Sequence, residues 1–85
     1  MKTHTIKILE DFADAIYTED KTFEIRKNDR GYQKGDYIIF NVIKADETHE
    51  HPIERKTYMI TYILNGWGLK NGYVAFSIRE MYSRG

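Results

Sequence analysis

The sequence has 85 residues with no cysteine, a single proline and no excess of charge of either sign. Because cysteine is absent, disulfide bridges, thiolate zinc sites and a cysteine nucleophile are excluded. No apolar run approaches the roughly 20 residues of a membrane-spanning helix, and no segment resembles a signal peptide. We therefore expect a cytoplasmic protein without a membrane partner. Lys plus Arg number 13, as do Asp plus Glu, so a partner selected by charge must be recognised through a local cluster.

The length allows one domain, spanning residues 1–85, and 41% hydrophobic with 31% charged residues is a globular balance. The neutral total hides a separation of charge along the chain. Residues 10–20 carry five carboxylates and no Lys or Arg, whereas residues 21–34 carry five Lys or Arg and two carboxylates. This pattern is either a solvated mixed surface or a local attraction for phosphate, because salt screens charge over about 8 Å.

Hydrophobic periodicity predicts five strands and one short amphipathic helix. The strands fall at residues 3–9, 22–27, 37–44, 55–64 and 73–81, and the helix at residues 10–20. Loops rich in turn formers separate them at residues 28–36, 45–52 and 65–72, and we expect the final residues to fray. The predicted core-facing residues are Ile6, Ile8, Phe12, Ile16, Phe23, Ile25, Tyr58, Ile60, Tyr62, Leu64, Val74, Phe76 and Ile78.

This order of elements has no βαβ rhythm and predicts an α+β fold. Amphipathic strands in so short a chain must close on themselves or leave exposed edges. We therefore expect a small, partly closed antiparallel or mixed β-barrel of about five strands, with the N-terminal helix packed at one end. An open α+β sandwich is the alternative.

The most informative segment is the strand that follows the acidic helix. Pleating places Thr22, Glu24 and Arg26 in one row about 6.6 Å apart, with Lys21 at the corner beside them. Glu24 would accept hydrogen bonds from a base or sugar edge, and Arg26 would bind carbonyl or phosphate oxygens. The alternative is an exposed strand face on which Glu24 and Arg26 form a weak ion pair.

Two further features favour a nucleic-acid ligand. Lys27 and Arg30, at the end of the same strand, are available for phosphate. Trp67 lies between two glycines, where its indole either stacks on a base or folds back as a lid over one end of the barrel. Tyr32 and Tyr73 are weaker stacking candidates, since most tyrosines of a small barrel pack in the core and its rim.

Histidine gives little indication of a metal site. His49 and His51 are two residues apart in a loop predicted to be solvated, and no third ligand stands at a recognisable spacing. We predict no metal and no cofactor.

The motif residues together resemble a small ASCH-like family of the PUA-like superfamily, whose members are compact bacterial and phage proteins of unknown function. In the general ASCH pattern a lysine is followed by a glutamate and an arginine two apart, as in Lys21, Glu24 and Arg26, whereas Glu19 stands where a glycine is usual. The resemblance implies a pseudo-barrel with a cleft near the helix end, and binding of RNA or a modified nucleoside. It is carried by the run at residues 21–30, Gly35-Asp36, Tyr62-Ile63-Leu64-Asn65-Gly66 and Gly72-Tyr73-Val74.

The leading hypothesis is a binding module for single-stranded RNA or a nucleoside, with no obligatory protein partner. Its ligand-binding residues would be Lys21, Thr22, Glu24, Arg26, Lys27, Arg30 and Trp67. One ASCH branch hydrolyses acylated cytidine with a lysine and a threonine three residues later, but Glu24 occupies that later position here. An altered amidohydrolase using Lys21, Thr22 or a Glu24-activated water is the alternative, and a phage-type protein-interaction module is a third possibility.

Overall fold

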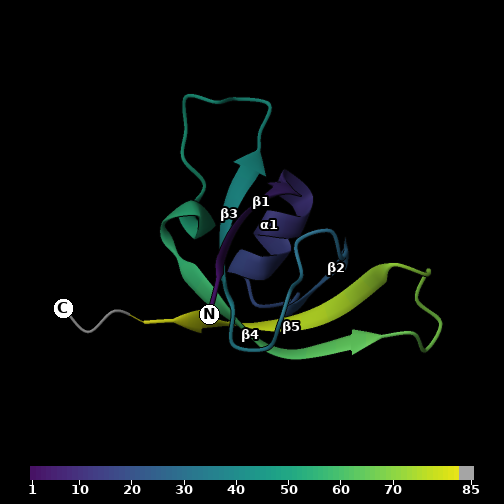
Figure 1. Cartoon of the computed structure of the whole chain (residues 1–85). Helices are drawn as coiled ribbons and strands as arrows, with labels where there is room; N and C mark the ends of the chain where they lie inside the picture. The colour runs from purple at the N-terminus through teal and green to yellow at the C-terminus, as the bar shows by residue number, and fades with distance from the viewer. Residues whose placement is uncertain (83–85) are drawn as a thin grey trace.

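The computed structural model describes residues 1–82, and the fraying predicted for the final residues concerns positions outside that range. The fold is α+β, as predicted, with five strands and one α-helix (Figure 1). No helix among residues 1–82 has the length and apolar character needed to cross a bilayer. The elements are β1 (Thr3–Leu9), α1 (Glu10–Tyr17), β2 (Phe23–Lys27), β3 (Tyr37–Ile43), a single 3₁₀ turn η1 (Pro52–Arg55), β4 (Thr57–Asn65) and β5 (Tyr73–Met81).

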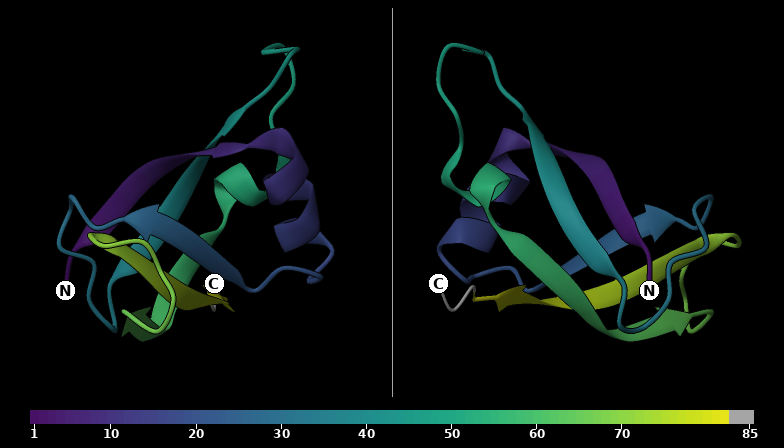
Figure 2. Two further views of the ribbon diagram at one scale, coloured as in Figure 1. Left: turned by 90° about the vertical axis from the view of Figure 1, so that its right-hand side faces the viewer. Right: turned by 60° about the vertical axis from the view of Figure 1, so that its left-hand side comes forward.

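The strands form one curled mixed sheet in the order β1-β3-β4-β5-β2 (Figure 2). Strands β1 and β3 are parallel, and the other neighbours are antiparallel. The predicted closure into a barrel is wrong, because β1 and β2 remain edge strands with no ladder between them in residues 1–82. Side chains satisfy part of these edges instead: the Arg26 guanidinium donates to the Lys7 carbonyl, and the Lys21 amine to the Phe23 carbonyl.

The core lies on the inner face of this sheet, and the alternation read from the sequence places most of it correctly. The helix α1 covers one end of the curled sheet, where it packs against β1, β3 and η1 and buries Ala13 and Ile16 (Figure 2). Phe12, expected in the core, is half exposed. The buried apolar strand residues are Ile6 and Ile8 of β1, Ile38, Phe40 and Val42 of β3, Tyr58 and Ile60 of β4, and Val74, Phe76 and Ile78 of β5.

Strand β2 faces the opposite way from the prediction. Phe23 and Ile25 are 45% and 52% exposed, whereas Glu24 is only 4% exposed. The pairing with β5 explains this, because Glu24 lies opposite Phe76, and directly opposed residues share a face of the sheet. The strand therefore presents its charged side chains to the interior and its large apolar side chains to the outside.

An irregularity in β4 overturns a second predicted face. The ladder with β5 shifts register between Ile60 and Tyr62, so one extra residue enters β4. A bulge of this kind interrupts the alternation of sides. Beyond it Tyr62 is 63% exposed, and Ile63 packs against the core in its place.

The helix is shorter than predicted, and its end is informative. It stops at Tyr17, and the N–H groups of Thr18 and Glu19 bond to the carbonyls of Asp14 and Ile16. Glu19 adopts a φ of 65°, which reverses the chain towards β2. Glycine reaches this conformation without strain, whereas the Cβ of Glu19 makes it costly.

Candidate anion-binding cleft

Glu24 is the centre of a charge cluster on the inner face of β2. Its Oε1 accepts from Lys21 Nζ, and its Oε2 accepts from Arg26 Nε at 3.0 Å. The Lys21 amine also donates to the Phe23 carbonyl at 2.7 Å. A carboxylate this buried is tolerated only when it is paired and hydrogen-bonded, and two cations meet that requirement here.

This geometry changes the role expected for Glu24. Both of its oxygens already bind the protein's own cations, so the residue is neither a weak surface pair nor a free acceptor for a base edge. It fixes the position of Arg26 instead. A guanidinium carries five N–H groups, and those not used by Glu24 and by the Lys7 carbonyl remain for a ligand.

A cleft of about 580 Å³ lies between the open edges of β1 and β2. Its polar lining is mainly cationic, with the two carboxylates Glu24 and Asp29 against four basic side chains. Clustered cations beside low-dielectric walls raise the local concentration of anions. The basic side chains of the cleft are Lys7, Arg26, Lys27 and Arg30.

Tyr32 also lines this cleft, although the residue is only 5% exposed. Its ring packs on His4 and Phe76, with centroids 4.8 and 5.0 Å away, so packing replaces the predicted stacking role. Burial raises the pKa of Tyr32, against the opposing effect of Arg26 and Arg30. The hydroxyl makes no hydrogen bond within residues 1–82, and no fully enclosed side-chain N or O in that range lacks a partner. The hydroxyl therefore reaches the cleft, where it is protonated and can donate to a ligand.

The rim of the cleft is apolar and unusually open to solvent. Leu9, Phe12, Ile25 and Ile43 all line it, and each is about half exposed. Large apolar side chains beside a cationic cluster suit a ligand that has both an anionic group and a flat or apolar part.

The predicted site residues only partly converge. Glu24, Arg26, Lys27 and Arg30 line the cleft, and Lys21 touches it through Glu24. Thr22 does not line it, since it lies just before β2 and faces a separate cavity with Lys21.

Trp67 also lies apart from the cleft. It is 90% exposed in the loop between β4 and β5, at a φ of 51°, so it is not a lid. Tyr73 lines the cleft near its end.

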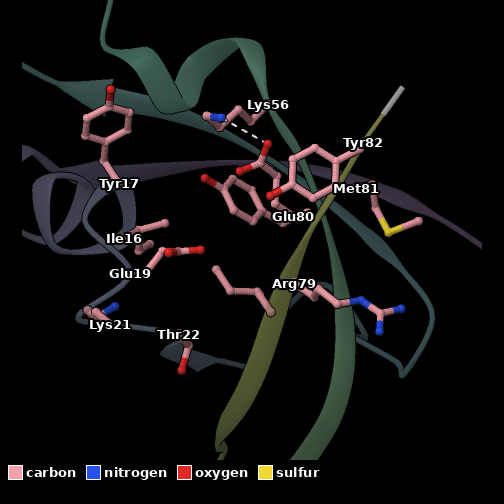
Figure 3. A pocket seen from close by; sticks show the side chains of 12 residues that line it. Ile16, Tyr17, Glu19, Lys21, Thr22, Lys56, Arg79, Glu80, Met81 and Tyr82 are labelled. Atoms are coloured by element: carbon pink, nitrogen blue, oxygen red, sulfur yellow. Dashed lines mark hydrogen bonds and ion pairs between the residues drawn. The ribbon is translucent and has the colours of Figure 1, made fainter. Parts of the chain in front are cut away.

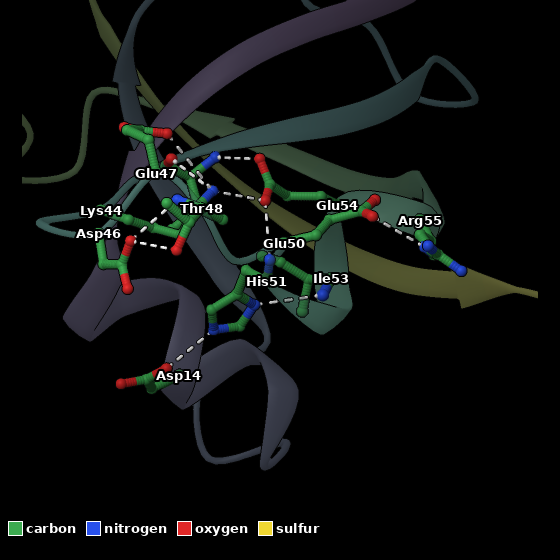
Figure 4. A network of polar contacts seen from close by, with 11 residues as sticks. Asp14, Lys44, Asp46, Glu47, Thr48, Glu50, His51, Ile53, Glu54 and Arg55 are labelled. Atoms are coloured by element: carbon green, nitrogen blue, oxygen red, sulfur yellow. Dashed lines mark hydrogen bonds and ion pairs between the residues drawn. The ribbon is translucent and has the colours of Figure 1, made fainter.

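The histidines have structural roles that the sequence analysis missed. His51 is buried rather than solvated: its Nδ1 accepts from the Ile53 N–H at 3.2 Å, and its Nε2 lies 2.8 Å from Asp14 Oδ1 (Figure 4). The ring therefore caps η1 and joins it to α1. Pro52 at the first turn position and Glu three residues after the cap were the available signals. Within residues 1–82, no three His, Asp or Glu side chains are grouped so as to hold a metal.

A second buried histidine holds the start of β1. His4 Nε2 lies 2.8 Å from Asp36 Oδ2, and the N–H groups of Lys2 and Gln33 also donate to this carboxylate. Burial alone would raise the pKa of Asp36, but these hydrogen bonds outweigh it and lower the pKa. The charged carboxylate therefore links the N-terminal strand to the turn before β3.

Glu54 organises the segment between β3 and β4. Its carboxylate accepts from Lys44 Nζ at 2.7 Å and from the N–H groups of His51 and Val42 at 2.8 and 3.0 Å (Figure 4). The hydrogen bond from Lys44 lowers the pKa of Glu54 to about 2, against the opposing effect of burial and with help from the two backbone donors. The predicted loop is thus partly a charged, ordered network.

Comparison with known proteins identifies a family but no activity. The chain belongs to the family described as "Domain of unknown function (DUF3850)", whose model matches residues 3–78. No curated protein matches. A solved crystal structure, that of hypothetical protein PH0355, is similar to this chain with a TM-score of 0.62 and 18% identity. The similarity covers 95% of this chain and 100% of that one, and it supports the fold alone.

Proposed function

We propose that this DUF3850 domain binds single-stranded RNA or a nucleotide in the cleft between β1 and β2. The observation that carries the proposal is the combination of four basic side chains, the Tyr32 hydroxyl and an apolar rim around one cavity. Phosphate contacts supply most of the affinity of proteins for nucleic acid, and stacking or apolar contact with the base adds to it.

Each group then has a distinct role. Arg26, held in place by Glu24, and Arg30 bind phosphate oxygens, while Lys7 and Lys27 add longer-range attraction. The Tyr32 hydroxyl donates to an oxygen of the ligand. The base or sugar lies against the apolar rim, where Ile25 is exposed.

The ASCH-like resemblance supports the same proposal. Lys21, Glu24 and Arg26, the residues that match the ASCH pattern, are the three members of the buried charge cluster. An ASCH-like, PUA-like domain that binds RNA in the cytoplasm is therefore our finer interpretation of this family.

The amidohydrolase alternative has less support. The Lys21 ammonium donates to Glu24 and to the Phe23 carbonyl, and Thr22 lines a different cavity from Glu24. A general base needs a free lone pair, which an ammonium engaged in this way does not offer. Acylated cytidine incubated with the protein tests this alternative, and turnover that disappears in Lys21→Ala would support it. A protein-interaction role predicts instead a pull-down that survives nuclease treatment.

The test of RNA binding is fluorescence anisotropy with a labelled oligouridylate at several salt concentrations. Arg30→Ala removes an exposed basic side chain of the cleft, and Lys34→Ala removes one that does not line it. We expect Arg30→Ala to weaken binding about fivefold and to reduce the salt dependence by roughly one phosphate contact. Lys34→Ala should bind like the wild type. Equal affinities for the two variants, or no binding by the wild type at low salt, would contradict the proposal.

A further inference from the structure

A second cavity, of about 700 Å³, lies between the end of α1 and strands β4 and β5 (Figure 3). It shares no lining residue with the anion-binding cleft. Its apolar and aromatic walls include Ile16, Tyr17, Tyr58, Ile78 and Tyr82. Nothing in the proposed RNA-binding role uses this space.

The basic side chains at this cavity are already engaged or directed elsewhere. Lys56 Nζ donates to Glu80 Oε2 at 2.9 Å, and Lys21 is bound to Glu24. Figure 3 shows the Arg79 guanidinium pointing away from the cavity and the Glu19 carboxylate pointing into it. Glu19 has no ion-pair partner among residues 1–82 and is thus an available negative charge at the cavity.

Tyr58 supplies an independent sign that the cavity receives a ligand. The residue is only 5% exposed, yet it lines the cavity. No fully enclosed side-chain N or O among residues 1–82 lacks a partner, so the Tyr58 hydroxyl, which forms no hydrogen bond there, reaches the cavity. Burial raises the pKa of Tyr58 to about 12, with additional contributions from Glu80, Tyr82 and Glu19. The hydroxyl therefore stays protonated at neutral pH and is a polar group that a ligand in the cavity can contact.

The backbone at Glu19 points in the same direction. A φ of 65° is uncommon for any residue other than glycine, and glycine would adopt it without strain. Backbone strain is often found at functional sites, and here it occurs at a residue whose side chain enters a cavity. Here the retained side chain is a carboxylate.

We infer that this cavity binds a small organic cation, such as an alkylammonium, between Glu19 and the tyrosine rings. The carboxylate would accept from the ammonium, and the faces of Tyr58 and Tyr82 would contribute cation–π attraction. The alkyl chain would lie against Ile16 and Ile78. This inference is independent of the RNA-binding proposal, because the two cavities have different lining residues.

The test uses butylammonium, with butanol and butyrate as a neutral and an anionic probe of similar shape, followed by amide chemical shifts of the labelled protein. We expect butylammonium to bind about fivefold more tightly than butanol, with shifts centred on Glu19, Tyr58 and Ile78. Butyrate should bind more weakly than either. Equal affinity for butylammonium and butanol, or shifts centred elsewhere, would overturn the inference.

Three variants separate recognition from folding. Glu19→Gln keeps the strained backbone but removes the charge, and it should abolish the preference for butylammonium. Glu19→Gly should also abolish the preference while raising the temperature of thermal unfolding, because it removes the strain. Asp11→Asn, on the exposed start of α1 and away from the cavity, should bind like the wild type. A preference that persists in both Glu19 variants contradicts the inference.

Discussion

Replacing Glu24 by alanine is predicted to cause a large loss of stability, although the sequence alone leaves open that Glu24 lies on an exposed strand face. The substitution leaves Lys21 and Arg26 without their carboxylate, and the two cationic side chains are only 16% and 23% exposed. Removing one partner of a buried ion pair costs about 3–5 kcal/mol. Because solvent reaches both cations, we expect the lower end, about 3 kcal/mol.

Such a loss is a considerable part of the stability of an 85-residue domain. It should lower the temperature of thermal unfolding by about 12–24 °C, since each kcal/mol shifts it by roughly 4–8 °C at this size. Glu24→Gln, which keeps one acceptor but loses the charge, should lie between alanine and the wild type.

The assay is urea denaturation monitored by circular dichroism, with Glu50→Ala as the matched control. Glu50 pairs with Arg55 at the same 3.0 Å distance, but both side chains are largely solvated, at 48% and 80% exposed. That control should change the free energy of unfolding by less than about 0.5 kcal/mol. If Glu24→Ala loses no more than the control, Glu24 is not the buried organiser of Arg26 and our reasoning about the cleft is wrong.

Three further predictions concern the rest of the chain. Glu54 has its pKa lowered from 4.5 to about 2, so its stabilisation is complete above pH 4.5 and is lost as the pH falls towards 2. The unfolding free energies of the wild type and Glu54→Gln should thus differ by up to about 3 kcal/mol near neutral pH and converge in acid; a constant difference in urea titrations would contradict this. His51→Ala should lower the free energy of unfolding by about 1–2 kcal/mol, because it removes the cap of η1. In the same urea titrations His51→Asn should recover part of that loss, and equal losses for the two variants would exclude capping. Trp67→Gly should leave stability within about 0.5 kcal/mol and the affinity for uridine monophosphate within about twofold; a larger loss of affinity in anisotropy competition would place the indole at the ligand.

Hydrophobic alternation predicted the strands well, because the buried residues of β3 and β5 are all apolar and those of β1 are apolar except His4. It failed at β2, where Phe23 and Ile25 are the more hydrophobic pair but Glu24 is the buried residue. Alternation shows that a strand has two faces, and the choice between them depends on its partner strand. Here the pairing with Phe76 and the cations at Lys21 and Arg26 decide it, and this choice depends on contacts distant in the sequence.

Part of the candidate site followed from the sequence, and part depended on three-dimensional contacts. The basic run predicted that Arg26, Lys27 and Arg30 lie together, and all three line the cleft, because clustered charge at one strand end stays clustered in the fold. Lys7 joins them only because the curled sheet brings the edge of β1 towards β2. The position of Tyr32 in the cleft could not be predicted from the sequence either, since it depends on packing against His4 and Phe76.

We propose above all that the cleft between β1 and β2 binds the phosphate of a nucleotide. An NMR titration that compares uridine 5′-monophosphate with uridine isolates the contribution of the phosphate. We predict that the monophosphate binds about tenfold more tightly, with amide shifts at Thr5, Lys7, Arg26 and Arg30. Equal affinities for the two compounds, or shifts confined to the hairpin at Trp67 or to the cavity at Glu19, would show that this cleft does not bind the phosphate.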